Sequence, residues 1–127
     1  MTVTHVNPAG LHTSPVYSQG VLTEGGRTLY VGGQNGTDAN GAIVGGIAEQ
    51  TAQAFRNVLA VLAAVGAGPE HVVKLTIHLT ADADLGAGFA AAQTVWGNHP
   101  TAITVLRVAG LARPEALVEI DAIAALP

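Results

Sequence analysis

The sequence has no cysteine, and only 11% of its residues are charged and 4% aromatic. Without cysteine, the protein has no disulfides, thiolate metal ligands or cysteine nucleophile. Five Lys and Arg residues and a formal net charge of -4 are too little positive charge to build a groove that follows phosphates. We therefore expect no nucleic-acid partner.

The sequence also lacks a long hydrophobic run. Its longest apolar stretch, residues 58–68, is shorter than the roughly 20 residues that a helix needs to span a bilayer, so we expect no membrane partner. The first ten residues lack the basic start and apolar run of a signal peptide, and we expect a cytoplasmic location. None of the five histidines belongs to a two-ligand metal motif, and we expect neither a metal nor a cofactor.

The chain does have enough apolar residues for a core. Its 127 residues are 49% hydrophobic, which predicts one domain over residues 1–127. A small protein has a large surface to cover, and this one has little charge with which to cover it. Either its surface is rich in neutral polar groups, or part of that surface contacts another subunit.

Two segments have the periodicity of amphipathic helices. In residues 47–65, apolar side chains and Thr51 recur at steps of three and four, and Gly66 and Gly68 end the segment. Residues 82–96 repeat the pattern, with Leu85, Phe89 and Trp96 on one stripe. Both segments are predicted to bury one face.

Alternating or β-rich segments predict strands at residues 17–22, 28–32, 71–80, 102–109 and 116–124. We expect a hairpin turn at residues 24–26, a second hairpin between the last two strands, and a turn-rich segment up to Pro15 that wraps a surface. This order predicts an α+β fold in which two helices cover one face of a mixed sheet. The other face is expected to carry Ile103, Val105, Leu117 and Ile123 toward neighbouring subunits.

Several stretches, in order, are similar to one family. They are residues 17–19 (YSQ), 31–34 (VGGQ), 50–57, 59–62 (LAVL), 72–76 (VVKLT) and 117–124 (LVEIDAIA). With these stretches the sequence resembles the Rid family (YjgF/YER057c/UK114) over nearly the whole chain. The resemblance implies a chorismate-mutase-like α+β fold and a homotrimer with a small-molecule cleft between subunits. It also implies hydrolysis of reactive imines and enamines, the deaminase reaction of the best-known members.

The sequence departs from the deaminase branch of that family at one important position. That branch binds the substrate carboxylate with an arginine, and counting back from residues 108–111 places Ile103 at this position. Isoleucine offers no donor for a bidentate pair with a carboxylate. In the same comparison Val105, Gly32 and Gln93 replace polar family residues. We therefore expect a less charged or more apolar substrate than a 2-imino acid.

The resemblance also assigns candidate catalytic residues. Glu119 is the family's water-positioning carboxylate, and Tyr17 is expected to border the cleft. Each has a simpler interpretation. Glu119 is expected nearly opposite Arg107 and would then form a cross-strand ion pair. Tyr17 would be an amphipathic residue of a subunit interface.

The remaining candidates are predicted to bind substrate. They are Gly32, Gly33, Gln34, Gln93, Trp96, Ile103 and Val105. The glycines can also be a plain turn at a strand end, and Trp96 can simply pack in the core. Two functional hypotheses remain open. One is a Rid-like imine or enamine hydrolase with an altered substrate, and the other is a non-catalytic trimer that binds metabolites or a protein.

Overall fold

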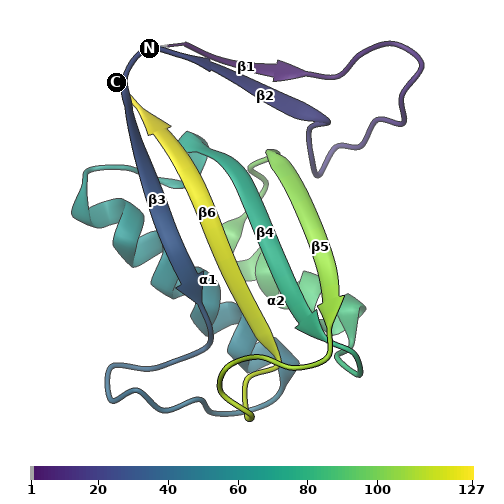
Figure 1. Ribbon diagram of the computed structural model, residues 1–127, viewed down its shortest axis with the longest axis vertical. Coiled ribbons are helices and arrows are strands. Elements are labelled where there is room, and N and C mark those ends of the chain that lie inside the picture. The colour runs from purple at the N-terminus through teal and green to yellow at the C-terminus, as the bar shows by residue number, and fades with distance from the viewer. Residues whose placement is uncertain (1) are drawn as a thin grey trace.

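The computed structural model describes residues 2–127, in which six strands and two helices follow one another in the order βββαβαββ (Figure 1). The elements are β1 (Thr2–Val6), β2 (Gly20–Glu24), β3 (Arg27–Gln34), α1 (Ile47–Ala64), a single 3-10 turn (Pro69–His71), β4 (Val72–Thr80), α2 (Leu85–Trp96), β5 (Ala102–Val108) and β6 (Val118–Leu126). None of the helices in residues 2–127 is both long and apolar enough to cross a membrane.

Four strands form the main sheet, in the order β3-β6-β4-β5. The β4–β5 pair is parallel and the other pairs are antiparallel. Figure 1 shows both helices behind one face of this sheet. The α+β prediction with two helices on one face of a mixed sheet is confirmed.

Helix α1 forms because a capping interaction at its start and an apolar stripe along one side both favour a helix over the same residues. The backbone N–H of Gly46 donates to the Glu49 carboxylate at 3.0 Å, which satisfies a donor at the helix start. Phe55, Val58 and Leu62 recur along one stripe and are buried against the sheet. Helix α2 is capped at its N-terminus by Asp84, whose carboxylate accepts a hydrogen bond from the Ala87 N–H.

The predicted hairpin between the last two strands is wrong. Strand β4 lies between β5 and β6, because β5 returns from α2 and pairs in parallel with β4. Arg107 therefore lies beside Leu79 and not opposite Glu119. Its Nη1 donates to the carbonyl oxygens of Ala81 and Ala83, at 3.1 and 2.9 Å. The proposed Arg107–Glu119 ion pair is thereby excluded.

The N-terminal region also differs from the prediction. The segment up to Pro15, expected to be turn-rich, includes β1. This strand pairs with β2 in a separate two-stranded sheet at the top of Figure 1. Gly25 and Gly26 form the expected turn with positive φ angles, but β2 and β3 do not pair. The N–H of Ser18 donates to the carbonyl of Thr101 at 2.8 Å, which attaches the chain before β2 to the start of β5.

The strand registers divide the side chains of the sheet between two faces. Val118, Ile120 and Ala122 are buried on the face that packs against the helices, which we call the helix face. Glu119 and Asp121 alternate with them and lie opposite His78 and Thr76 on the other side, which we call the open face.

The prediction that Ile103 and Val105 lie on the open face is wrong. They pair with Leu75 and Ile77 in the parallel register and therefore share the helix face. The residues of β5 that alternate with them, Ala102, Thr104 and Leu106, belong to the open face. Ile123 does lie there, beside Tyr30 and Lys74 in the registers of β6.

Candidate functional site

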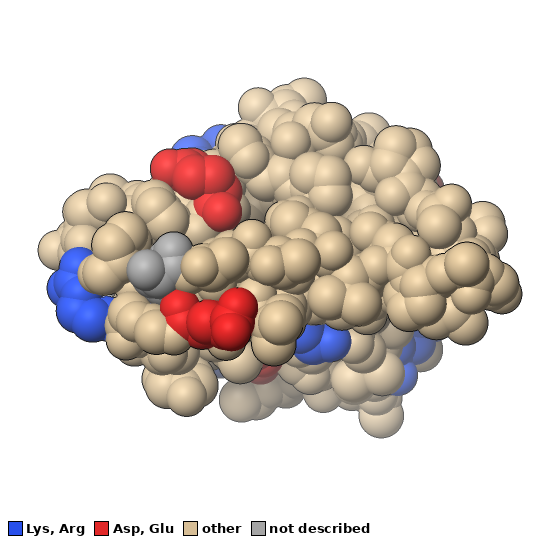
Figure 2. Space-filling view, turned by 90° about the horizontal axis from the view of Figure 1, so that it is seen from above, with Lys and Arg blue, Asp and Glu red and all other residues tan. Residues whose placement is uncertain are grey.

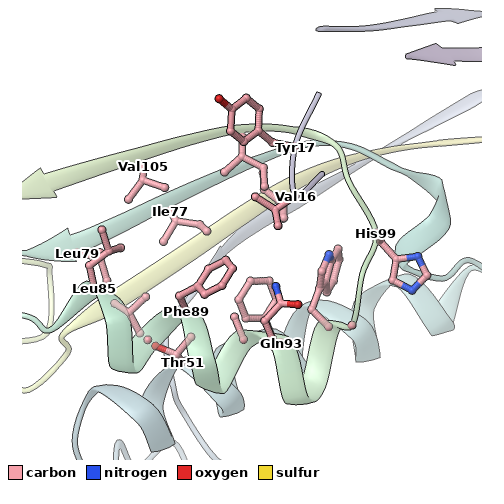
Figure 3. A pocket seen from close by; sticks show the side chains of 18 of the residues that line it. Val16, Tyr17, Thr51, Ile77, Leu79, Leu85, Phe89, Gln93, His99 and Val105 are labelled. Carbon is pink, nitrogen blue, oxygen red and sulfur yellow. The ribbon is translucent and has the colours of Figure 1, made fainter. Parts of the chain in front are cut away.

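An apolar cavity of about 300 Å³ lies between α2 and the helix face of β4 and β5. Figure 3 shows Ile77 and Val105 pointing from the strands toward Phe89 and Gln93 on the helix. Ligand pockets in proteins span roughly 300–1,000 Å³ and are lined mainly by apolar groups. The cavity therefore has the size and lining of a site for a compact small molecule.

The cavity exists because α2 packs closely against α1. Gly88 has no side chain, and a Cβ built there would lie 3.5 Å from Ile47 Cγ1 and Thr51 Oγ1 of α1. Farther along α2, the ring of Trp96 packs on Phe55 with centroids 5.1 Å apart. Helix α2 thus contacts α1 at two places, while the space between its inward face and β4–β5 remains unfilled.

The structure brings five of the predicted site residues together at this cavity. The residues are Tyr17, Gln93, Trp96, Ile103 and Val105. Trp96 is buried on Phe55 and also forms part of the cavity wall, so core packing and a lining position coexist. Their expected contact with substrate remains a prediction.

The polar groups of the cavity are mainly hydroxyl, amide and imidazole groups. They come from Tyr17, Thr51, Gln93, Asn98 and His99, and no Asp, Glu, Lys or Arg lines the cavity. The hydroxyl of Thr51 is buried and has no hydrogen-bond partner among the described residues. The lining thus offers hydrogen bonds but no ionic partner for a charged ligand.

A second group of predicted residues lies at the end of β3 and on β6, where Gly33 meets Glu119 on the open face and Gln34 pairs with Ile120. A Cβ built on Gly33 would come within 2.8 Å of Glu119 Cδ, so the carboxyl group of Glu119 rests directly against the backbone of Gly33. Gln34 donates from Nε2 to the Gly32 carbonyl at 3.2 Å. The sheet separates this group from the cavity, because Glu119 alternates with the cavity-lining Val118.

Glu119 forms no ion pair within residues 2–127. It faces His78 across the β4–β6 pair, and Nδ1 of His78 is buried without a hydrogen-bond partner in the described chain. Lys74 lies on the same face, and its Nζ donates to Thr104 Oγ1 at 2.6 Å. The carboxylate is therefore held in place by packing while its oxygens remain available to a water or a ligand.

Thr51 and His78 were not predicted to belong to either group. Thr51 lies on the apolar stripe of α1. A hydroxyl group on such a stripe is the sequence signal that could have identified it as a residue of the cavity. The sequence placed His78 on the polar side of its strand, but only the register of β4 on β6 shows that it faces Glu119. No cluster of three or more His, Asp or Glu in residues 2–127 is arranged to hold a metal ion.

Comparisons with known proteins agree with this architecture. The family model described as "Endoribonuclease L-PSP" matches residues 9–126. A rat protein named 2-iminobutanoate/2-iminopropanoate deaminase is 38% identical over 110 residues, which cover 85% of this chain and 78% of the rat protein. The protein DfrA of Myxococcus xanthus is 38% identical over 114 residues, covering 85% of this chain and 83% of that protein.

Solved structures extend the likeness to the whole fold. A Rid-family protein of unknown function from Yersinia pestis superposes with a TM-score of 0.86 at 33% identity, covering 99% of this chain and 100% of that one. A Thermotoga maritima protein described as a putative endoribonuclease gives a TM-score of 0.74 at 31% identity, covering 95% and 92%. The shared architecture is an α+β domain with two helices on a mixed sheet. The chain belongs to the Endoribonuclease L-PSP family, which is the Rid family that the sequence resembles.

Proposed function

We propose that this protein hydrolyses the C=N bond of a small imine, or of the imine form of an enamine, at Glu119 on the open face. In this reaction water adds to the imine carbon as the Glu119 carboxylate accepts a proton from it. Glu119 passes this proton to the nitrogen, which gives a carbinolamine. Transfer of the hydroxyl proton to the nitrogen then accompanies breakage of the C–N bond, so that ammonia leaves and the carbon becomes a carbonyl. The names of several relatives, 2-iminobutanoate/2-iminopropanoate deaminases, support this reaction class.

The observation that carries the proposal is the placement of Glu119. Its carboxyl group rests on the Gly33 backbone, and no cation in residues 2–127 neutralises it. A general base must be close to the proton that it abstracts and must not be committed to another partner. Glu119 is free of an ion-pair partner in residues 2–127, and a water molecule bound beside it on the open face would meet the first condition.

The surroundings of β5 support a substrate with less negative charge than a 2-imino acid. Ile103, at the position of the family's arginine, carries no donor and faces the cavity. Arg107 is engaged by the carbonyl oxygens of Ala81 and Ala83. Strand β5 thus presents no guanidinium to a carboxylate beside Glu119, which favours an imine without a carboxylate as substrate.

We further propose that the open face is covered by a second copy of the chain in a homotrimer, which would complete a cleft around Glu119. The face carries apolar side chains with little cover, among them Tyr30 at 74% and Leu106 at 45% exposure. Figure 2 views the molecule from above, at right angles to Figure 1, and shows a few charged groups among mostly uncharged residues at that end. Exposed apolar area of this kind is typical of subunit contacts.

The test is a comparison of substrates with the purified full chain. Hydrolysis of freshly generated 2-iminopropanoate is measured beside that of imines without a carboxylate, for the wild type and for Glu119→Gln. We expect acceleration of the carboxylate-free imines and its loss in the variant. Faster hydrolysis of 2-iminopropanoate alone would refute the substrate class, and undiminished turnover by Glu119→Gln would refute the role of the carboxylate.

The apolar cavity supports a second candidate function, a non-catalytic protein that binds a metabolite. A pocket lined mainly by apolar groups, with no Asp, Glu, Lys or Arg, can hold a ligand without transforming it. If none of the imines is hydrolysed faster than in buffer while a small molecule still binds, this second function replaces the first.

A further inference from the structure

We propose that His78 binds the nitrogen of the substrate's C=N group beside Glu119 and donates a hydrogen bond to it from Nε2. This inference rests on the proposed hydrolysis and adds a second functional side chain to the same site. It also narrows the substrate class to imines whose nitrogen has a free lone pair, because only such a nitrogen can accept this hydrogen bond.

His78 and Glu119 lie directly opposite each other on the adjacent strands β4 and β6 (Figure 1). The Cβ atoms of such cross-strand partners are about 4.5–5.5 Å apart on one face of a sheet. The carboxyl group of Glu119 leans the other way, against the backbone of Gly33 on β3. Glu119 and His78 form no ion pair in residues 2–127. The carboxylate and the imidazole therefore flank a space on the open face that a small C=N group can enter.

The surroundings of the imidazole decide which of its nitrogens carries the proton. Nδ1 of His78 is buried and has no hydrogen-bond partner in the described chain. A neutral imidazole carries its proton on one nitrogen only, and buried N–H groups without an acceptor are rare in folded proteins. On the β5 side the neighbour of His78 is Leu106, whose side chain offers no acceptor. The proton therefore belongs on Nε2, which makes this nitrogen a hydrogen-bond donor.

The reaction gives such a donor a specific use. As water adds to the imine carbon, the electron pair of the C=N π bond moves onto the nitrogen. A hydrogen bond from Nε2–H of His78 strengthens as this negative charge develops, and it turns the imine carbon toward the water beside Glu119. His78 keeps its own proton throughout, because the proton that the nitrogen gains comes from the water by way of Glu119.

Three substitutions at His78 test the donor, with the carboxylate-free imine that the wild type hydrolyses fastest as substrate. His78→Gln carries an amide N–H near the position of Nε2, His78→Asn carries one near the position of Nδ1, and His78→Phe has none. We expect His78→Gln to lose no more than about threefold in kcat and the other two variants at least about tenfold, with smaller changes in KM. Wild-type kcat for His78→Phe, or equal losses in all three variants, would overturn the proposal.

Thr76 provides the matched control on the same strand. It lies two residues before His78 on the open face, where its cross-strand partner is Asp121 and not Glu119. Thr76→Val removes a polar group from this face without touching the proposed donor, and we expect it to keep the wild-type kcat. A loss equal to that of His78→Phe would show that any change on this face of β4 slows the reaction, which would overturn the specific role of His78.

A second measurement does not depend on turnover. Nitrogen NMR of isotope-labelled protein reports which imidazole nitrogen is protonated, and the signals of His78 are those that His78→Gln lacks. We expect the proton on Nε2 at mildly alkaline pH. We also expect acetone O-methyloxime, a stable C=N compound, to shift the Nε2 signal in a saturable way in the wild type and in Glu119→Gln. A proton on Nδ1, or an Nε2 signal that the oxime leaves unchanged, would overturn the proposal.

The two measurements separate this proposal from the function on which it rests. If the wild type hydrolyses none of the imines, the proposed function fails, and a saturable shift of Nε2 by the oxime would still support the binding of a C=N group by His78. If imines are hydrolysed and Glu119→Gln loses this activity while His78→Phe keeps it, the proposed function stands and the role of His78 is overturned.

Discussion

The two faces of the main sheet are built from the same strands and have opposite chemistry. On β6, Val118, Ile120 and Ala122 face the helices and are buried, while Glu119 and Asp121 between them face outward. The period of two along a strand is sufficient to produce this division. The comparison teaches that a residue lining an apolar cavity and an unpaired carboxylate can be next to each other in sequence yet on opposite sides of the sheet.

The largest expected effect of a single change concerns the open face. Glu119→Gln keeps the size of the side chain and removes its ability to accept a proton from water. General acid–base catalysis contributes factors of about 100 or more, and we expect at least that loss in the rate of imine hydrolysis. Circular dichroism and the midpoint of thermal unfolding should stay close to wild type, because Glu119 makes no ion pair in residues 2–127.

A pair of leucine truncations compares what the two faces contribute to stability. Leu75 is fully buried on the helix face, and Leu75→Ala should lower the free energy of unfolding by about 2–5 kcal/mol. Leu106 lies half exposed on the open face, and Leu106→Ala should cost less than about 1 kcal/mol in a dilute, dissociated chain. Urea unfolding at several protein concentrations measures both values.

The concentration series adds a test of the proposed trimer. If copies associate through the open face, Leu106→Ala should weaken association, and its effect on unfolding should grow with protein concentration. Leu75→Ala should destabilise the protein by a similar amount at every concentration. A chain that light scattering shows to be monomeric throughout would rule out the inter-subunit cleft.

Two neighbouring glycines test the support of Glu119. A Cβ at Gly33 would come within 2.8 Å of the Glu119 carboxyl carbon, whereas one at Gly32 would meet nothing within 4 Å. Gly33→Ala should therefore displace the carboxylate and slow imine hydrolysis by about tenfold or more, while Gly32→Ala should retain wild-type rates. Equal rates for the two variants would show that the contact does not position Glu119.

Much of the fold could be predicted from the sequence because its signals are local. The stripe through Phe55 and Leu62 predicted α1 to within one residue at its end, and the alternation in residues 71–80 predicted β4 almost completely. The strand neighbours could not be predicted in this way. Alternation shows which residues share a face, but it does not show that β4 separates β5 from β6.

The same limit applies to the candidate site. Glu119, Gly33 and the cavity residues were all named from the sequence, but the sequence did not show that they lie on two faces of one copy of the chain. Their division between two faces depends on the parallel register that sets Ile103 beside Leu75. The hydroxyl of Thr51 was missed for a different reason, because its lack of a partner is a property of the folded environment.

The smallest expected effect tests the division of β5 between the faces directly. Restoring the family's arginine as Ile103→Arg would place the guanidinium in the apolar cavity, away from Glu119, and should not produce hydrolysis of 2-iminopropanoate. Thr104→Arg would place it on the open face, near Lys74 and on the side of Glu119. We expect this second variant to lower the KM for 2-iminopropanoate by a modest factor, about three- to tenfold, because a guanidinium pairs with its carboxylate. A gain by Ile103→Arg and none by Thr104→Arg would show that the cavity side of β5, and not its open face, contributes to the reaction site.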